Sequence, residues 1–254
     1  MIHGASQDFS VRLARSTSDL HAAQRLRYDV FVKELGGSGT MVDHAAGLER
    51  DRYDSFVDHL LLTDNRTGDV IGVYRLMRSD MADRAGGFYT EGEYDIGPLK
   101  ATGRRLLELG RSCLHRDYRG GIAMHRLWAG LAAYVAEHDI ELLFGVASFH
   151  GTDSAALAQP LSLLHHVYLA PPELRVRARA EGRQPMDLIP TEGLDRRGAM
   201  LQIPSLMKAY LRLGGCVGDG AFIDRAFNTT DVCLVLDTKK LSERQLRIYG
   251  GQPG

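Results

Sequence analysis

The stretch of sequence that decides the fold is LLELGRSCLHRDYRGGIA, residues 106–123. Its first half belongs to an apolar segment, residues 105–115, which predicts a strand. A turn rich in arginine and glycine follows, and apolar residues at helical spacing over 121–137 predict a helix. Residues 141–149 are strongly apolar and predict a buried second strand. Because a strand–helix–strand crossover joins parallel strands, we expect these two strands to be parallel.

The flanking sequence predicts further elements on both sides of this unit. Upstream we expect a strand at 9–15, a helix capped at Ser16 that runs through Phe31, and a hairpin of strands at 57–63 and 69–77. The loops expected are 38–53 and 78–103. Downstream we expect a short apolar segment at 161–169, a helix at 205–213, strands at 221–227 and 232–236, and a short helix capped by Ser242.

This order of elements predicts an α/β (α+β) fold with a mixed sheet, because the hairpin is antiparallel and the crossover pair is parallel. No repeat or low-complexity linker divides the chain. We therefore expect a single domain over residues 1–254, with an insertion-like helical or loop segment around 155–200.

The composition is that of an ordinary globular protein. Among 254 residues, 44% are hydrophobic, and 31 Lys and Arg balance 32 Asp and Glu. The apolar runs are far shorter than the roughly 20 residues of a spanning helix, and residues 1–8 lack the features of a signal peptide. The three cysteines show neither disulfide nor zinc spacing, so we expect a cytoplasmic protein with no metal site. Near-zero net charge and no recognition motif argue against DNA binding.

Two charges, Glu108 and Arg111, interrupt the apolar strand. Buried charges are costly, so such residues are expected to be paired or functional. Strict alternation places them on opposite faces, unless a bulge, for which Gly110 is well placed, brings them to one face. The following turn offers Arg116, Arg119 and the amino end of a helix to an anion; an ordinary glycine turn is the alternative.

The order of elements and this turn resemble the GNAT (Gcn5-related N-acyltransferase) superfamily. The resemblance implies a mostly antiparallel sheet with a central parallel strand pair flanked by helices. It also implies that the turn holds the pantetheine part of an acyl-thioester donor. Residues 119–123 are one residue shorter than the usual Arg/Gln-x-x-Gly-x-Gly/Ala loop. The shorter loop is compatible with a donor that presents mainly pantetheine, such as an acyl carrier protein.

Further motifs narrow the resemblance. A series of four motifs resembles the acyl-homoserine-lactone synthases. The motifs are an Arg/Phe pair in residues 26–36, Asp-x-x-Asp in 49–54, an Arg in 73–76 and Glu-x-x-Arg at 108–111. Residues 203–215 and 223–232 differ from those synthases and resemble the bacterial ornithine N-acyltransferases of ornithine-lipid biosynthesis.

The resemblance implies an L-ornithine N(alpha)-acyltransferase that moves a 3-hydroxyacyl chain from acyl carrier protein to the α-amine by direct aminolysis. The product implied is lyso-ornithine lipid, with (3R)-hydroxyacyl-acyl carrier protein as co-substrate and no bound cofactor. Glu108 is the candidate general base, and backbone N–H groups near Arg111 and Ser112 are the candidate oxyanion donors. The implied donor-binding residues are Ser112, Arg116, Arg119, Gly120, Gly121 and Ile122. The implied acceptor-binding residues are Arg27, Asp51, Asp54 and Arg75.

Several alternatives stay open. The four acceptor residues could equally form a structural ion network that orders the long loop. The chain could instead be a signal synthase that uses S-adenosylmethionine, or a non-catalytic module that binds acyl carriers or lipids. Cys113 beside His115 could form an acyl-enzyme, although a buried packing role is favoured and we leave both out of the catalytic set. Residues 161–169 with the arginines that follow could contact the inner face of an anionic membrane.

Overall fold

The computed structural model describes residues 8–39 and 41–241, and the helix expected at Ser242 lies outside them. The chain forms two compact units. The first unit holds the chain up to Ala85 together with Leu109–Asp139, and the second holds Gly86–Glu108 and Ile140–Leu241. The chain passes from the second unit back to the first within strand β5 (Leu106–Leu114). The single domain with an insertion stays a prediction, and each unit is described by itself.

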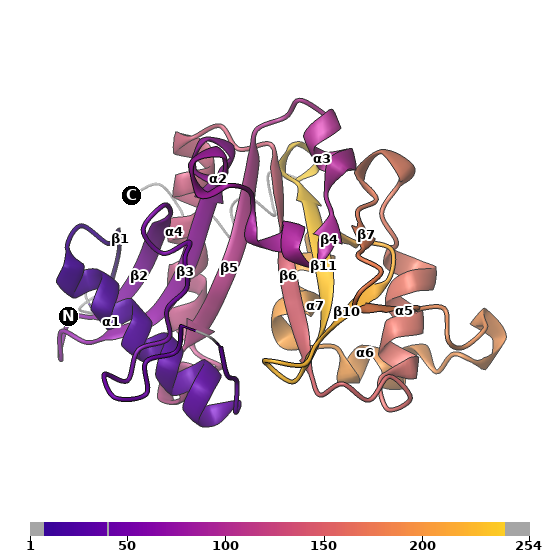
Figure 1. Ribbon diagram of the computed structural model, residues 1–254, viewed down its shortest axis with the longest axis horizontal. Helices are drawn as coiled ribbons and strands as arrows, with labels where there is room; N and C mark the ends of the chain where they lie inside the picture. Colours follow the sequence, from indigo (N-terminus) through magenta and orange to yellow (C-terminus); the bar gives the residue numbers. More distant parts are fainter. Residues whose placement is uncertain (1–7, 40, 242–254) are drawn as a thin grey trace, which may run out of the picture. The chain divides into compact units, whose positions relative to one another are not determined.

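In the first unit, strands lie side by side in the order β1, β2, β3 and β5 (Figure 1). Strand β1 (Phe9–Leu13) pairs with β2 (Asp58–Asp64), and β2 pairs with β3 (Val70–Arg78), both antiparallel. The predicted hairpin is therefore confirmed. The helices are α1 (Thr17–Arg27), α2 (Ser79–Ala85) and α4 (Ile122–Glu137).

Helix α1 begins as the sequence predicts, because the Ser16 side chain accepts a hydrogen bond from the backbone N–H of Asp19 at 3.1 Å. The expected helix through Phe31 changes type, since Tyr28–Glu34 forms a π-helix. Such segments are rare and often lie at functional sites. Gly36, with φ of +73°, then ends the helical run in a conformation that suits glycine.

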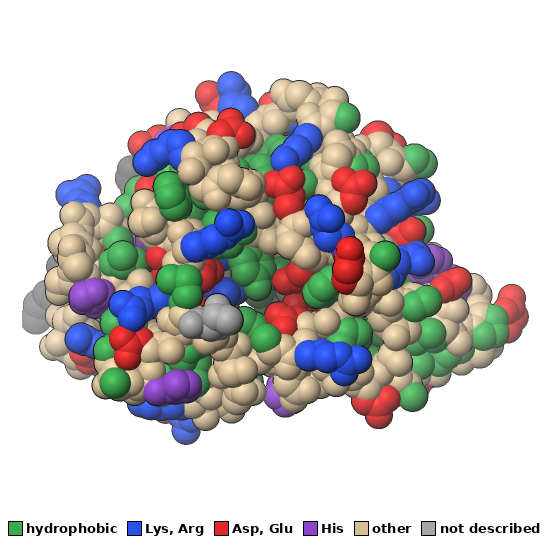
Figure 2. All heavy atoms as spheres, viewed as in Figure 1, with side chains coloured by type: hydrophobic (Ala, Val, Ile, Leu, Met, Phe, Trp, Pro, Cys, Tyr) green, Lys and Arg blue, Asp and Glu red, His purple; other side chains and the backbone are tan. Residues whose placement is uncertain are grey.

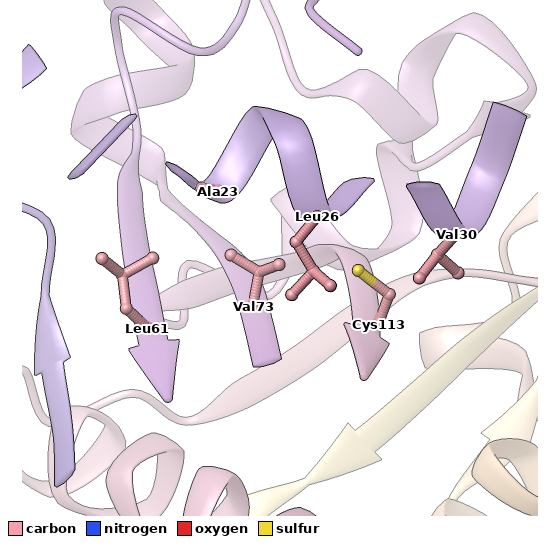
Figure 3. Close-up of a cluster of buried hydrophobic side chains, with 6 residues drawn as sticks. All are labelled: Ala23, Leu26, Val30, Leu61, Val73 and Cys113. Carbon is pink, nitrogen blue, oxygen red and sulfur yellow. The ribbon is translucent and has the colours of Figure 1, made fainter. Parts of the chain in front are cut away.

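The core of the first unit lies between α1 and the sheet (Figure 3). Ala23, Leu26 and Val30 come from the helical run and meet Leu61, Val73 and Cys113 from three neighbouring strands. Helix α4 covers the other face of the sheet. A Cβ atom added to Gly130 of α4 would lie 3.5 Å from the Leu60 side chain. Leu60 is next to Leu61 on β2, so its side chain points to the face opposite Leu61. The sheet is therefore buried on both faces.

In the second unit, the first residues of β5 are followed across the sheet by β6 (Leu142–His150), β11 (Thr229–Asp237), β10 (Ala221–Asp224) and β8 (Arg183–Gln184). Strands β5 and β6 are parallel from Leu106 opposite Leu142 to Glu108 opposite Phe144. The β6–β11, β11–β10 and β10–β8 pairs are antiparallel. A mixed, mostly antiparallel sheet with a parallel pair is therefore confirmed.

The remaining elements of the second unit are short. They are β4 (Tyr94–Asp95), paired with β7 (Arg177–Ala178), then β9 (Cys216–Val217) on β11, and helices α3 (Gly97–Ala101), α5 (Ala158–Tyr168), α6 (Arg196–Gln202) and α7 (Ser205–Arg212). Helix α7 agrees with the sequence. The apolar residues 161–169 form most of α5, which packs beside α6 (Figure 1).

One expectation about residues 78–103 was wrong. We predicted a loop, whereas the segment contains α2, a 3₁₀ turn at Tyr89–Gly92, β4 and α3. Each of these pieces spans seven residues or fewer, so none repeats a hydrophobic period often enough to be recognised. Strand β11 also begins three residues before the predicted Val232, since Thr229 already pairs with His150.

Charged side chains of both signs are interspersed over the face seen in Figure 2, with hydrophobic side chains between them. This distribution matches the near-zero net charge of the sequence. Within residues 8–39 and 41–241, every helix is too short or too polar to cross a bilayer.

Candidate active-site residues

Glu108, the candidate base, lies near the middle of β5 and is 4% exposed. Its two carboxylate oxygens accept hydrogen bonds from consecutive backbone N–H groups, from Tyr89 at 3.0 Å and from Thr90 at 2.6 Å. These N–H groups begin the 3₁₀ turn Tyr89–Gly92. The free N–H groups at the start of a helical turn suit an anion. The turn therefore holds the carboxylate in one orientation and favours its ionised form.

Arg111 belongs to the first unit and has a left-handed backbone, with φ of +50°. Such a conformation is uncommon for a residue with a side chain and marks a break in the regular strand. The break that we expected at Gly110 is therefore found one residue later. The guanidinium of Arg111 donates from Nε to Glu49 Oε1 at 3.1 Å and from Nη2 to Asp51 Oδ2 at 3.4 Å.

The four predicted acceptor residues come together in the first unit as a buried ion network. Arg27, which is 0% exposed, donates from Nη1 to Asp54 Oδ1 at 2.7 Å and from Nε to Glu49. Arg75 donates to Asp51, and its Nη1 lies 3.7 Å from Asp54 Oδ1. The sequence had not singled out Glu49, which is buried and accepts from both Arg27 and Arg111.

The network is electrically compensated. It contains three guanidiniums, Arg27, Arg75 and Arg111, and three carboxylates, Glu49, Asp51 and Asp54. Burial raises the pKa of Asp51, but the nearby Arg75 and Arg111 outweigh it and lower this pKa to about 2. Burial likewise opposes ionisation of Asp54, whose pKa is lowered overall by Arg27. Both carboxylates are therefore ionised at neutral pH and held in place by the arginines.

The predicted donor-binding residues follow one another from β5 into α4. Gly120 has φ of +77°, and Gly121 is the N-cap of α4 without a side-chain cap. The guanidinium of Arg119 forms hydrogen bonds within the protein. It donates to the Leu114 carbonyl oxygen at 3.0 and 3.1 Å and to the Glu34 carboxylate. Ser112 is part-buried on β5. Arg116 is exposed in the turn, and Ile122 is exposed as the first residue of α4.

Cys113 is a packing residue of the first unit's core rather than a poised nucleophile. Its side chain lies among Leu26, Val30 and Val73 (Figure 3). Burial raises the pKa of this thiol to about 12. A thiol with such a pKa is protonated at neutral pH, and the thiolate is the reactive form. This agrees with leaving Cys113 out of the catalytic set.

A cluster of three carboxylates in the second unit was not anticipated from the sequence. Glu93, Asp224 and Asp231 each bring one carboxylate oxygen within 4.8 Å of the other two. Glu93 and Asp231 are buried and Asp224 is half-buried. Such a group of oxygens is suited to a cation. The absence of a metal stays a prediction. In the sequence, Asp224 and Asp231 both fall within residues 223–232, the segment that resembles the ornithine N-acyltransferases. Nothing else in the sequence pointed to this cluster.

Comparison with known proteins agrees with the fold and with these motifs. Residues 26–129 match the family model of the acetyltransferase (GNAT) domain. The L-ornithine N(alpha)-acyltransferase of Rhodobacter capsulatus is 56% identical over 250 residues, which cover 96% of each chain. That of Brucella abortus is 42% identical and covers 99% of this chain and 92% of the relative.

Solved structures show the same fold at low sequence identity. A CoA-dependent acyl-homoserine lactone synthase, BjaI, aligns with a TM-score of 0.55 at 16% identity, over 97% of this chain and 91% of that one. FeeM, an N-acyl amino acid synthase from uncultured soil microbes, aligns with a TM-score of 0.54 at 11% identity, over 93% and 94%. The resemblance expected from the sequence is confirmed. This chain is an N-acyltransferase of the GNAT fold and belongs to the L-ornithine N(alpha)-acyltransferase family.

Proposed function

We propose that the protein transfers a 3-hydroxyacyl chain from acyl carrier protein to the α-amine of L-ornithine and so makes lyso-ornithine lipid. The observation that carries this proposal is identity of 40–56% over nearly the whole chain with relatives named L-ornithine N(alpha)-acyltransferase. Neither the donor nor the product is named by those relatives, and the donor is argued below from residues of this chain.

The first step of the reaction is loss of a proton from the α-ammonium group, whose pKa is about 8. We assign this step to Glu108. The N–H groups of Tyr89 and Thr90 hold its carboxylate in one orientation. In this proposal Glu108 takes the proton directly or through one water molecule.

The neutral amine then attacks the thioester carbonyl carbon and forms the C–N bond. The carbonyl oxygen becomes an oxyanion, which backbone N–H groups near Arg111 and Ser112 stabilise in this proposal. The left-handed backbone of Arg111 supports that role, because such a conformation marks a break in the regular strand. The C–S bond then breaks, and the thiolate takes the proton that Glu108 had accepted. The new amide nitrogen loses its second proton to the carboxylate of Glu108 and then to solvent, which leaves the neutral amide. Direct transfer agrees with the protonated thiol of Cys113.

The donor in this proposal is acyl carrier protein rather than coenzyme A. Arg119 bonds both Glu34 and the Leu114 carbonyl, whereas the more exposed Arg116 has only a 4.0 Å contact with Glu34. Arg116 with the uncapped start of α4 suits the single phosphate of a phosphopantetheine arm. The nucleotide of coenzyme A carries additional phosphates and would require more cations. Arg116 and the exposed Ile122 would also meet the acidic, partly apolar surface of a carrier protein.

For the network around Arg27 we propose an ordering role. Its six charges compensate one another, and Arg27 is fully buried. The side chain of Asp51 keeps 16% exposure, which makes it the member able to meet the acceptor, while Arg27, Asp54 and Arg75 hold it in place.

We further propose peripheral contact of this cytoplasmic enzyme with the inner face of an anionic membrane, where its lipid product belongs. Leu201 at the end of α6 is 73% exposed, and Val167 and Leu188 of the same unit are also exposed. Arg196 and Arg197, exposed at the start of α6, are suited to anionic headgroups. Co-sedimentation with anionic vesicles should fall for Leu201→Ser, and unchanged binding would contradict this surface.

The proposed activity is tested by following thiol release from 3-hydroxyacyl carrier protein while free amino acids and S-adenosylmethionine are supplied in turn. Release with ornithine alone is expected. Release that needs S-adenosylmethionine would identify a signal synthase instead. Silence with every acceptor, while a named relative is active on the same donor, would favour a non-catalytic binding module.

A further inference from the structure

Glu34, the last residue of the π-helix Tyr28–Glu34, meets both arginines of the donor turn, residues 115–121, within the first unit. Its carboxylate accepts hydrogen bonds from both Nη atoms of Arg119, one of them at 2.9 Å. The same carboxylate lies 4.0 Å from Nη2 of Arg116. The sequence analysis had not singled out Glu34, because it precedes Arg119 by 85 residues.

Arg119 uses two sides of its guanidinium within the protein. Nε and Nη2 donate to the Leu114 carbonyl oxygen at 3.1 and 3.0 Å, while Nη1 and Nη2 donate to Glu34. The Leu114 carbonyl therefore holds the guanidinium in the turn independently of Glu34. The two parallel bonds to Glu34 are the arrangement in which an arginine also binds a phosphate. Glu34 thus occupies the N–H groups that an additional phosphate would require.

The effect of Glu34 on the turn is electrostatic rather than structural. The hydrogen bond from Arg119 lowers the pKa of Glu34 below its ordinary value, so the carboxylate is charged at neutral pH. The Glu34 and Arg119 side chains are 22% and 41% exposed, and ion pairs at such positions contribute little to stability. The main consequence of the pair is that one of the two cations of the donor turn is neutralised.

This arrangement bears on the choice of donor. In the proposed function, Arg116 and the start of α4 receive the single phosphate of a phosphopantetheine arm. Coenzyme A carries the same arm, but a second phosphate is bonded directly to the first. We propose that Glu34 sets the donor preference: it holds Arg119 and places a negative charge near Arg116, which disfavours coenzyme A relative to a carrier-protein arm. This inference rests on the proposed function and names the residue that selects the donor.

The competing explanation is that the pair of Glu34 and Arg119 only shapes the turn. The two explanations predict opposite effects when the charge of Glu34 is removed. If the pair shapes the turn, every donor should bind more weakly. If Glu34 sets the donor preference, coenzyme A should bind more tightly, because Arg119 stays anchored by the Leu114 carbonyl and its remaining N–H groups become available to a phosphate.

The experiment measures, by titration calorimetry, the affinities of the full-length protein for coenzyme A and for phosphopantetheine. The variant is Glu34→Gln, which removes the charge and keeps the size of the side chain. We expect its Kd for coenzyme A to fall by about 10-fold, the contribution of one charge-assisted hydrogen bond, with little change for phosphopantetheine. Asp29→Asn is the matched control, since Asp29 is an exposed acid of the same π-helix and pairs with Lys33.

A double variant and a kinetic measurement test the route through Arg119. In Glu34→Gln combined with Arg119→Gln, the gain for coenzyme A should disappear, because the cation that Glu34 held is gone. With ornithine as acceptor, Glu34→Gln should lower the ratio of kcat/KM for the carrier-protein thioester over the coenzyme A thioester by about 10-fold. The change should come from a lower KM for the coenzyme A thioester.

Weaker binding of both ligands by folded Glu34→Gln, or an unchanged Kd for coenzyme A, would overturn the proposal. An equal gain for both ligands, an equal gain in Asp29→Asn, or a gain that survives in the double variant would also contradict it. Failure of the proposed function is distinguishable, because the titrations contain neither acceptor nor acyl group. A protein that shows the expected affinities but does not acylate ornithine would refute the proposed function alone.

Discussion

The carboxylate of Glu108 accepts a hydrogen bond from the backbone N–H of Thr90 at 2.6 Å, and the two residues lie on different elements of the second unit. The neighbouring N–H of Tyr89 bonds the other oxygen at 3.0 Å. A buried carboxylate that accepts two such bonds is held in one orientation, which is what a positioned base requires.

Replacing Glu108 with Gln should remove the base while keeping the shape of the side chain. We expect kcat with ornithine to fall by about 10²–10⁴-fold, the usual contribution of a positioned acid–base group. Steady-state kinetics across pH 6–9 measures this, with Glu192→Gln, an exposed side chain of the same unit, as control. A folded Glu108→Gln protein with nearly normal kcat would exclude Glu108 as the base.

Breaking the network at its buried centre should destabilise the first unit strongly. Arg27→Met leaves Glu49 and Asp54 without their fully buried partner. Removal of one member of a buried ion pair costs about 3–5 kcal/mol, whereas Lys33→Met, in the exposed pair with Asp29, should leave the free energy of unfolding nearly unchanged. Urea denaturation compares the two free energies of unfolding. Similar values for both variants would contradict a structural network.

The same network predicts how stability depends on pH. The pKa of Asp51 is lowered to about 2 in the folded protein, below the value of about 4 in an unfolded chain. A lowered folded pKa stabilises the protein above the unfolded pKa, and this contribution is lost as pH falls toward the folded pKa. We therefore expect stability to fall between about pH 5 and pH 2, and less steeply in Asp51→Asn than in the unchanged protein. Parallel curves would show that Asp51 is not coupled to folding.

Cys113→Ala tests direct transfer. The side chain packs in the core, and its pKa of about 12 keeps the thiol protonated. We expect kcat within about twofold of the unchanged protein, with a lower melting temperature from the small cavity. Trapping of a radiolabelled acyl chain on the unchanged protein, together with loss of activity in Cys113→Ala, would indicate an acyl-enzyme.

The sequence was sufficient for the parts of the fold that repeat a hydrophobic period. Strands β5 and β6 with helix α4 were predicted to within about a residue, because their apolar residues recur over nine or more positions. The 3₁₀ turn Tyr89–Gly92 and strand β4 were missed, since they are too short to show a period. They exist because the tertiary structure supplies their partners, such as β7 for β4.

Some residues of the candidate site could be recognised from the sequence and others could not. Glu108, Arg111 and the Asp-x-x-Asp pair stood out because charges in apolar or motif-rich segments are conspicuous. Their partners did not, since Thr90 bonds Glu108 across 18 residues and Glu49 bonds Arg111 across 62. The cluster of Glu93, Asp224 and Asp231 spans more than half the chain, so only the folded hairpin and turn reveal it.

The most direct test of the proposed function is the identity of the amide that the purified protein makes. The protein is incubated with 3-hydroxyacyl carrier protein and ornithine labelled with ¹⁵N at the α-amine, and the product is fragmented in a mass spectrometer. We predict a single 3-hydroxyacyl amide on the labelled nitrogen, formed without S-adenosylmethionine, with free carrier-protein thiol released in equal amount. An amide on the unlabelled side-chain nitrogen, or no amide from this donor, would contradict the proposed function.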